Sequence, residues 1–82
     1  MKVYPNPTSN TATLDFNLSF GGEGDVGVFD MLGNKVADVY NGTIEAGNHL
    51  ITINTNSLNS GIYLIRMDIN GSSNVSHLVI SK

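Results

Sequence analysis

The chain has 82 residues, enough for one domain with a small hydrophobic core. Its four lysines and arginines and net charge of −3 exclude the basic face that nucleic acids and anionic membranes require. With no cysteine, core packing and backbone hydrogen bonds must hold the fold without disulfides. Only 13% of the residues are charged, and polarity comes mainly from Asn, Ser, Thr and Gly, which favour strands and turns.

The N-terminal quarter predicts an extended segment followed by a long strand. Pro5 and Pro7 lack the backbone donor of a central strand, so residues 3–7 indicate an edge strand or an extended lead-in. Residues 11–20 then alternate between polar and apolar side chains, which predicts a half-buried strand. Its inward-facing residues are Ala12, Leu14, Phe16, Leu18 and Phe20.

Residues 25–40 are predicted to form a hairpin that follows a glycine-rich connection at residues 21–24. The first strand, residues 25–32, is apolar on both faces, as expected for a central strand, with Met31 on one of them. Gly33 and Asn34 form the turn, and residues 35–40 the returning strand. We interpret Asp30 as an acceptor for backbone N–H groups of this turn, in preference to a plainly exposed residue.

Three further strands are predicted after a turn at residues 41–42. Residues 49–54 alternate, with Ile51 and Ile53 inward, and residues 61–69 form the longest apolar strand. Asn70-Gly71 is typical of a type I′ hairpin turn before a last strand at residues 75–81. About seven short strands in all predict an all-β fold, an immunoglobulin-like antiparallel β-sandwich, with a small closed barrel as the alternative.

A tyrosine near the start of the longest strand resembles the tyrosine corner of immunoglobulin-like sandwiches. A polar turn at residues 58–60 leads into Gly61, and Tyr63 follows two residues later. In such a corner the hydroxyl bonds to backbone a few residues upstream, and a core position follows, here Ile65. We therefore expect Gly61 and Tyr63 to be structural residues at a crossing between two sheets.

The sequence predicts no enzyme, no metal site and no cofactor. Residues 22–27 spell G-x-G-x-x-G, but a strand pattern follows where nucleotide binding needs a helix, so we interpret them as a turn. Glu23 and Asp25 supply too few oxygen ligands for calcium. His49 and His77 are not spaced as zinc ligands, and no nucleophile elbow is present.

Exposed aromatic side chains leave a carbohydrate-binding module as an alternative function. Tyr4, Tyr40 and Phe29 are the aromatics not assigned to the core or the corner, and a sugar platform would require them to be coplanar. An inert adhesion or spacer sandwich of a secreted protein is the other alternative.

Four stretches of the chain together resemble one family. They are Tyr-Pro-Asn-Pro at residues 4–7, Val-Phe-Asp-Met-Leu-Gly-Asn-Lys-Val at 28–36, Leu-Asn-Ser-Gly-Ile-Tyr-Leu-Ile-Arg at 58–66, and Leu-Val-Ile-Ser-Lys at 78–82. In this order they resemble the type A C-terminal sorting domain of the type IX (Por) secretion system of Gram-negative Bacteroidetes. The resemblance covers essentially the whole chain.

The resemblance implies that residues 1–82 are a single C-terminal sorting domain, a fragment of a larger secreted protein. It would direct an N-terminally fused cargo through the periplasm and across the outer membrane, to be secreted or displayed on the cell surface. Its implied partners are the outer-membrane translocon with its shuttle protein, and a sortase-like protease. Nucleic acid is not among them.

The last strand is the predicted docking element of this domain. Leu78 and Ile80 face one way, and Val75, His77 and Val79 the other, so apolar groups lie on both faces. A last strand is also expected at a sheet edge, where it can accept a partner strand or pair with a second copy. The predicted docking residues are Val75, His77, Leu78, Val79, Ile80 and Lys82.

Overall fold

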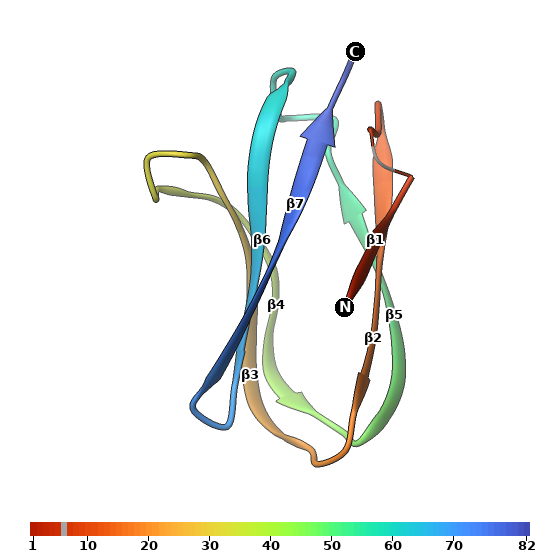
Figure 1. Cartoon of the computed structure of the whole chain (residues 1–82), viewed down its shortest axis with the longest axis vertical. Coiled ribbons are helices and arrows are strands. Elements are labelled where there is room, and N and C mark those ends of the chain that lie inside the picture. The colour runs from red at the N-terminus through yellow and green to blue at the C-terminus, as the bar shows by residue number, and fades with distance from the viewer. Residues whose placement is uncertain (6) are drawn as a thin grey trace.

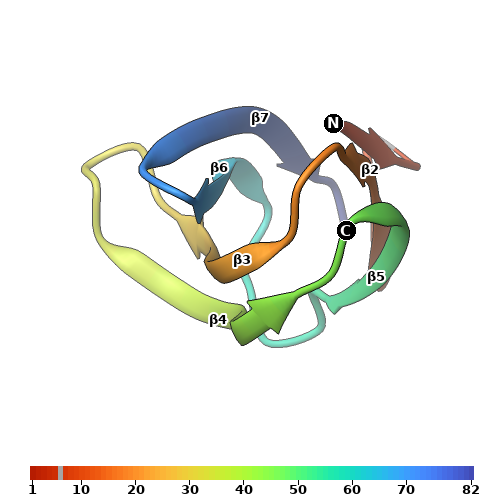
Figure 2. The same ribbon diagram turned by 90° about the horizontal axis from the view of Figure 1, so that it is seen from below.

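A computed structural model of the chain describes residues 1–5 and 7–82 and contains seven antiparallel strands in two sheets packed face to face (Figures 1 and 2). One sheet has three strands in the order β1-β2-β5, and the other has four in the order β4-β3-β6-β7. The strands are β1 (Lys2–Tyr4), β2 (Thr11–Leu18), β3 (Gly22–Phe29), β4 (Lys35–Ile44), β5 (Gly47–Asn54), β6 (Gly61–Ile69) and β7 (Ser72–Ile80). The all-β sandwich predicted from the sequence is confirmed.

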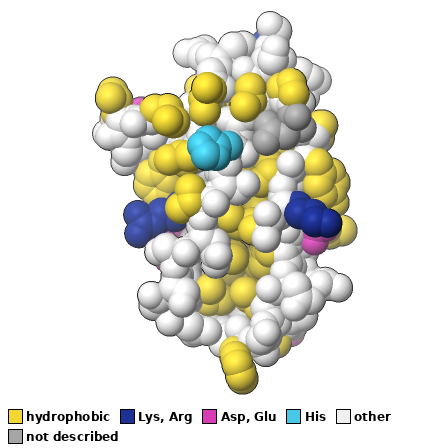
Figure 3. Space-filling view, in the orientation of Figure 1, with side chains coloured by type: hydrophobic (Ala, Val, Ile, Leu, Met, Phe, Trp, Pro, Cys, Tyr) yellow, Lys and Arg dark blue, Asp and Glu magenta, His cyan; other side chains and the backbone are white. Residues whose placement is uncertain are grey.

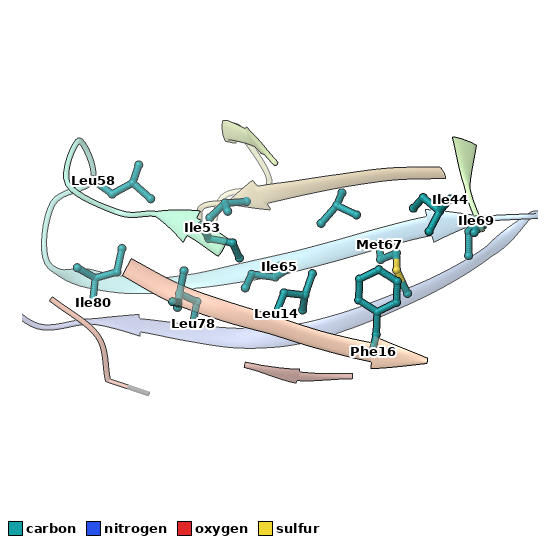
Figure 4. Close-up of a cluster of buried hydrophobic side chains, with 13 residues drawn as sticks. Leu14, Phe16, Ile44, Ile53, Leu58, Ile65, Met67, Ile69, Leu78 and Ile80 are labelled. Carbon is teal, nitrogen blue, oxygen red and sulfur yellow. The ribbon is translucent and has the colours of Figure 1, made fainter. Parts of the chain in front are cut away.

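The core lies between the two sheets and is built from alternate residues of the inner strands (Figure 4). Leu14 from the three-stranded sheet meets Ile65 and Leu78 from the four-stranded sheet, and all three are completely buried. This arrangement follows from period-2 patterning, because successive side chains of a strand point to opposite faces. It confirms the inward faces predicted for β2 and β5, except at Phe20, and the core position predicted at Ile65.

The predicted strand end at Phe20 is wrong. β2 ends at Leu18, which pairs with Gly47, the first residue of β5. Beyond that pair the ladder has no partner strand, so the chain bends away and leaves the Phe20 side chain 80% exposed. The alternation of polar and apolar residues in the sequence therefore continues to Phe20, two residues beyond the last paired residue of β2, Leu18.

The predicted glycine-rich connection at residues 21–24 and the predicted turn at residues 41–42 are also wrong, because all of these residues except Gly21 lie inside strands. The interpretation of residues 22–27 as a turn is wrong for the same reason, since all six belong to β3. β3 begins at Gly22 and β4 runs to Ile44, with Gly24 directly opposite Gly42. A Cβ atom on Gly24 would lie 2.6 Å from Cδ1 of Ile44, so glycine here permits close side-chain packing across the pair. β3 ends at Phe29, which leaves Met31 exposed in the turn instead of in the strand.

The last hairpin confirms the predicted turn and extends the last strand. Asn70 and Gly71 have φ angles of 51° and 78°, the left-handed conformations that a type I′ turn requires. β7 begins at Ser72, directly after the turn, and lies at the edge of the four-stranded sheet.

The two lateral sides of the sandwich are built differently. On one side Thr8, which is buried, bridges to β7: its N–H donates to the Val79 carbonyl oxygen at 2.8 Å, and its own carbonyl accepts from the Ser81 N–H at 2.8 Å. On the other side β4 and β5, the edge strands of different sheets, run past each other without pairing (Figure 2). Of the predicted N-terminal lead-in, Asn6 lies outside the described residues.

Candidate recognition surface

The chain crosses between the two sheets at residues 55–60, and Tyr63 follows near the start of β6. Its hydroxyl donates a hydrogen bond of 2.7 Å to the carbonyl oxygen of Asn59, and Ile65 is completely buried two residues later. This is the geometry of the tyrosine corner that the sequence suggested. A Cβ atom on Gly61 would lie 3.7 Å from the Tyr63 ring, an ordinary contact, so the packing at this position does not require glycine.

Asp30 organises the turn between β3 and β4. Its Oδ1 accepts hydrogen bonds of 2.9 Å from the backbone N–H groups of Leu32 and Asn34. The hydrogen bond from the Asn34 backbone is the main reason that the pKa of the Asp30 carboxyl lies below its usual value. Gly33 has φ of +90°, a conformation that favours glycine. The capped turn projects from the body of the sandwich (Figure 1).

The predicted docking residues divide between the interior and the surface. Leu78 and Ile80 are core residues, whereas Val75 is 55% exposed, His77 is exposed and Val79 is half-buried. Lys82 follows the strand, and its Nζ donates to the Asn56 carbonyl oxygen at 2.8 Å. Of the predicted docking residues on β7, only Val75, His77 and Val79 are therefore accessible to a partner.

These outward residues belong to a larger apolar surface on the four-stranded sheet, which we call the outer apolar face. Ile62 lies opposite Val79 in the pairing of β6 with β7, and Leu64 lies opposite Phe29 in the pairing of β6 with β3. Ile62 is 52% exposed. The outer apolar face consists of Phe29, Ile62, Leu64, Val75 and Val79.

A hollow of about 260 Å³ lies within this face, and its lining residues are Phe29, Gly33, Leu64, Arg66, Ser73 and Val75. In the projecting turn beside it, Met31 is 62% and Leu32 89% exposed. Figure 3 shows hydrophobic side chains gathered on the half of the molecule that carries this turn. The docking surface predicted from the sequence did not contain Ile62 and Leu64, although their apolar side chains, on the opposite face of β6 from Ile65, signalled a second apolar face.

From Arg66 and Ser73 at the border of the hollow, the same sheet face continues as a charged region whose charges are paired with one another. Arg66 Nε lies 3.0 Å from an Asp68 oxygen, and Lys35 Nζ lies 3.5 Å from Asp25. The Ser73 hydroxyl also donates to Asp68, and this bond is the main cause that lowers the pKa of the Asp68 carboxyl. Because these charges already have partners, the apolar half gains more from being covered by another protein.

The remaining polar and aromatic candidates are dispersed. His49 stacks on Phe16 with ring centroids 5.2 Å apart, and Glu23 accepts a hydrogen bond from Thr43. Within residues 1–5 and 7–82, no group of three or more His, Cys, Asp or Glu side chains is placed to hold a metal ion. In the same residues no helix has the length and apolarity needed to span a bilayer.

The three aromatics considered for a sugar platform do not form one surface. Tyr4 lies on β1, beside the Thr8 bridge, whereas Tyr40 lies on β4 at the opposite side of the sandwich. The Tyr40 hydroxyl donates to the Thr43 carbonyl oxygen at 2.6 Å. Phe29 is half-buried, with Lys35 Nζ 6.0 Å from its ring centroid.

Comparison with known proteins identifies the family. Residues 2–81 match the family described as "Secretion system C-terminal sorting domain". A comparison with curated proteins gives no match. The matched range contains almost all of the four stretches from which the resemblance was inferred. The chain therefore belongs to the family of secretion-system C-terminal sorting domains, which direct secreted and cell-surface proteins through the type IX secretion system.

Proposed function

We propose that the outer apolar face is the surface through which this sorting domain docks onto the secretion machinery. The observation that carries the proposal is the solvent exposure of Ile62 and Val75, on the side of the sheet that faces away from the core. A two-layer sandwich of this size needs only one apolar face per sheet. A second, contiguous apolar face costs solubility and is typical of a binding surface.

β7 contributes to this surface in the proposal through outward side chains alone. Val75 and Val79, with His77 between them, present a short row beside Ile62, while Leu78 and Ile80 hold the strand to the core. Lys82 adds a positive charge next to this row. Recognition of this kind needs a rigid and chemically inert module, which fits a non-enzymatic role.

The route and the individual partners follow from family membership, and we propose them for this chain. Residues 1–82 form a single domain fused behind an N-terminal cargo, which crosses the inner membrane by a separate signal. In the periplasm the folded domain is recognised by the outer-membrane translocon and its shuttle protein. A sortase-like protease then separates the domain from the cargo.

Export of a fluorescent cargo tests the docking surface. The cargo carries an N-terminal export signal and residues 1–82 at its C-terminus, in a bacterium with a functional type IX system. The double variant Ile62→Asp, Val75→Asp places charges on the outer apolar face and should retain the cargo in the periplasm. Deletion of residues 78–82 is not a suitable test of docking, because it would also remove the buried Leu78 and Ile80 side chains from the core.

The matched control is Phe20→Asp, which alters an exposed apolar residue on the connection between β2 and β3, at the far end of the sandwich. It should leave export at the level of the unaltered domain. Export of the double variant at that same level, with its melting temperature unchanged, would refute docking through the outer apolar face. Retention of cargo carrying the unaltered domain would instead refute the sorting function for this chain.

A further inference from the structure

The four sheet edges of this domain are not equally protected. β1 has three residues and is followed by Pro5, and β7 is bridged by Thr8 near its end. β4 carries Lys35 and Asp38 and has two register shifts against β3. Charges, prolines, bulges and short length are the devices by which proteins prevent unwanted strand pairing. β5 has none of them: its eight residues are uncharged, contain no proline, and pair with β2 without a register shift.

The outer edge of β5 presents a regular row of backbone donors and acceptors. The Thr55 N–H donates to the Asn10 carbonyl oxygen, which fixes the backbone of Thr55 toward β2. In an antiparallel ladder this orientation alternates, so every second residue upstream points its N–H and C=O away from β2. Among the described residues, β5 pairs with no strand but β2. The four residues that point outward are Asn48, Leu50, Thr52 and Asn54.

Two hollows lie along the open side, where β4 runs past this edge. One is about 320 Å³ and is lined by Tyr40, Thr43, Ile44, Glu45, His49 and Ile51. The other is about 220 Å³ and is lined by Ala37, Asp38, Val39, Thr52, Ile53 and Asn54. Half-buried Val39 and Ile51 leave apolar surface in them. An added strand would therefore find backbone partners and apolar hollows at the same place.

The larger hollow favours a cationic side chain. Glu45 and Tyr40 are both among its lining residues, and a carboxylate and an aromatic ring face each attract a cation. The nearest described basic group on β4, Lys35, is already paired with Asp38 at 2.6 Å. No ion pair within the described residues involves Glu45.

We infer that the open side binds an extended strand of a partner protein, which pairs with the outer edge of β5 and inserts a lysine or arginine between Tyr40 and Glu45. A second copy of this chain fits the site poorly, because β5 contains no lysine or arginine to fill the larger hollow. The site lies on the opposite side from β7, and the inference does not depend on docking through the outer apolar face.

Two synthetic peptides probe the site on the 82-residue chain: acetyl-Thr-Val-Thr-Lys-Thr-Val-Thr-Val-amide and the same peptide with glutamate in place of lysine. The lysine peptide should slow amide hydrogen exchange at Leu50 and Thr52 and leave Ser73 and Val75 of β7 unchanged. The glutamate peptide should bind about tenfold more weakly or not at all, because it places two carboxylates together. Equal binding of both peptides, or protection confined to β7, would overturn the inference.

Two variants distinguish pairing with the backbone from side-chain attraction. Thr52→Pro removes one outward donor and should weaken binding of the lysine peptide at least tenfold, whereas the matched Val75→Pro on β7 should not. Glu45→Gln, which leaves the backbone intact, should weaken it by about threefold. No response to either variant would overturn the inference. So would a concentration-dependent dimer that slows exchange at Leu50 and Thr52 without peptide, since it would assign the edge to a second copy.

Discussion

The two lateral sides of this sandwich differ in whether backbone hydrogen bonds connect the edges of the two sheets. On one side, two backbone hydrogen bonds to Thr8 tie the N-terminal segment to β7. On the other side, the described residues form no comparable bridge between β4 and β5, and hollows remain between these strands. The bridged side therefore contributes to stability, whereas the open side leaves the outer edge of β5 accessible to the partner strand that we infer. Four predictions test this comparison.

The largest expected effect is at Leu78, on the bridged side. Leu78→Ala removes methyl groups from a completely buried position and should lower the free energy of unfolding by about 2–5 kcal/mol, measured by urea denaturation. Val75→Ala, three residues earlier on the same strand but 55% exposed, is the control and should change it by about 0.5 kcal/mol or less. Similar losses in both variants would show that β7 is not divided into a core face and a surface face.

A smaller difference is expected between proline substitutions on the two sides. Thr8→Pro removes both the N–H that donates to the Val79 carbonyl oxygen and the hydroxyl that donates to the Thr11 carbonyl oxygen, and the loss of these two hydrogen bonds should cost roughly 1–3 kcal/mol. Thr52→Pro affects only an outward donor of β5 and should cost less than about 1 kcal/mol. Thermal denaturation of both variants measures the contrast. A larger loss for Thr52→Pro would reverse the assignment of the two sides.

The crossing from β5 on the open side to β6 in the other sheet depends on Tyr63. Tyr63→Phe deletes the hydroxyl that donates to Asn59 and should lower the free energy of unfolding by about 0.5–1.5 kcal/mol. Ile62→Ala, at the preceding exposed position, serves as the control and should be nearly neutral. An unchanged stability for Tyr63→Phe would mean that ring packing alone maintains the corner.

The smallest effect concerns pH and the turn that leads into β4. The pKa of Asp30 is below the ordinary value of 3.8 in the folded state, because the Asn34 and Leu32 N–H groups stabilise the carboxylate. This contribution to stability is fully present above pH 3.8 and is lost as the pH falls through the lower, folded-state pKa. Asp30→Asn should flatten the pH dependence of the melting temperature in this acidic range. A dependence as steep as that of the unaltered chain would assign it to other carboxyls.

Prediction from the sequence succeeded where local chemistry decides the structure. Asp30 is followed by a Gly-Asn turn, Asn70-Gly71 favours a primed turn, and Tyr63 follows a polar turn; each has one dominant low-energy arrangement. Prediction failed at Gly24 and Gly42, which resemble turn residues. They face each other within two paired strands: Gly24 permits close packing against Ile44, and Gly42 has φ of +142°, so neither reverses the chain.

The candidate recognition surface was predicted only in part. Val75, His77 and Val79 point outward, as the alternation of β7 required, but their apolar neighbours Ile62 and Phe29 come from other strands. Which strands lie side by side depends on pairing between distant segments, and alternation within one strand carries no information about it.

The sequence by itself determined that the chain is an all-β sandwich with a tyrosine corner and that it resembles a sorting domain. These properties depend on side-chain periodicity, turn chemistry and motif order, which are local. Only the tertiary structure decided that Thr8 bridges to β7, that β5 is the unprotected edge, and that Leu78 and Ile80 are core residues. The physical reason is that an edge is open or covered according to which distant backbone groups reach it, and that depends on how the two sheets pack.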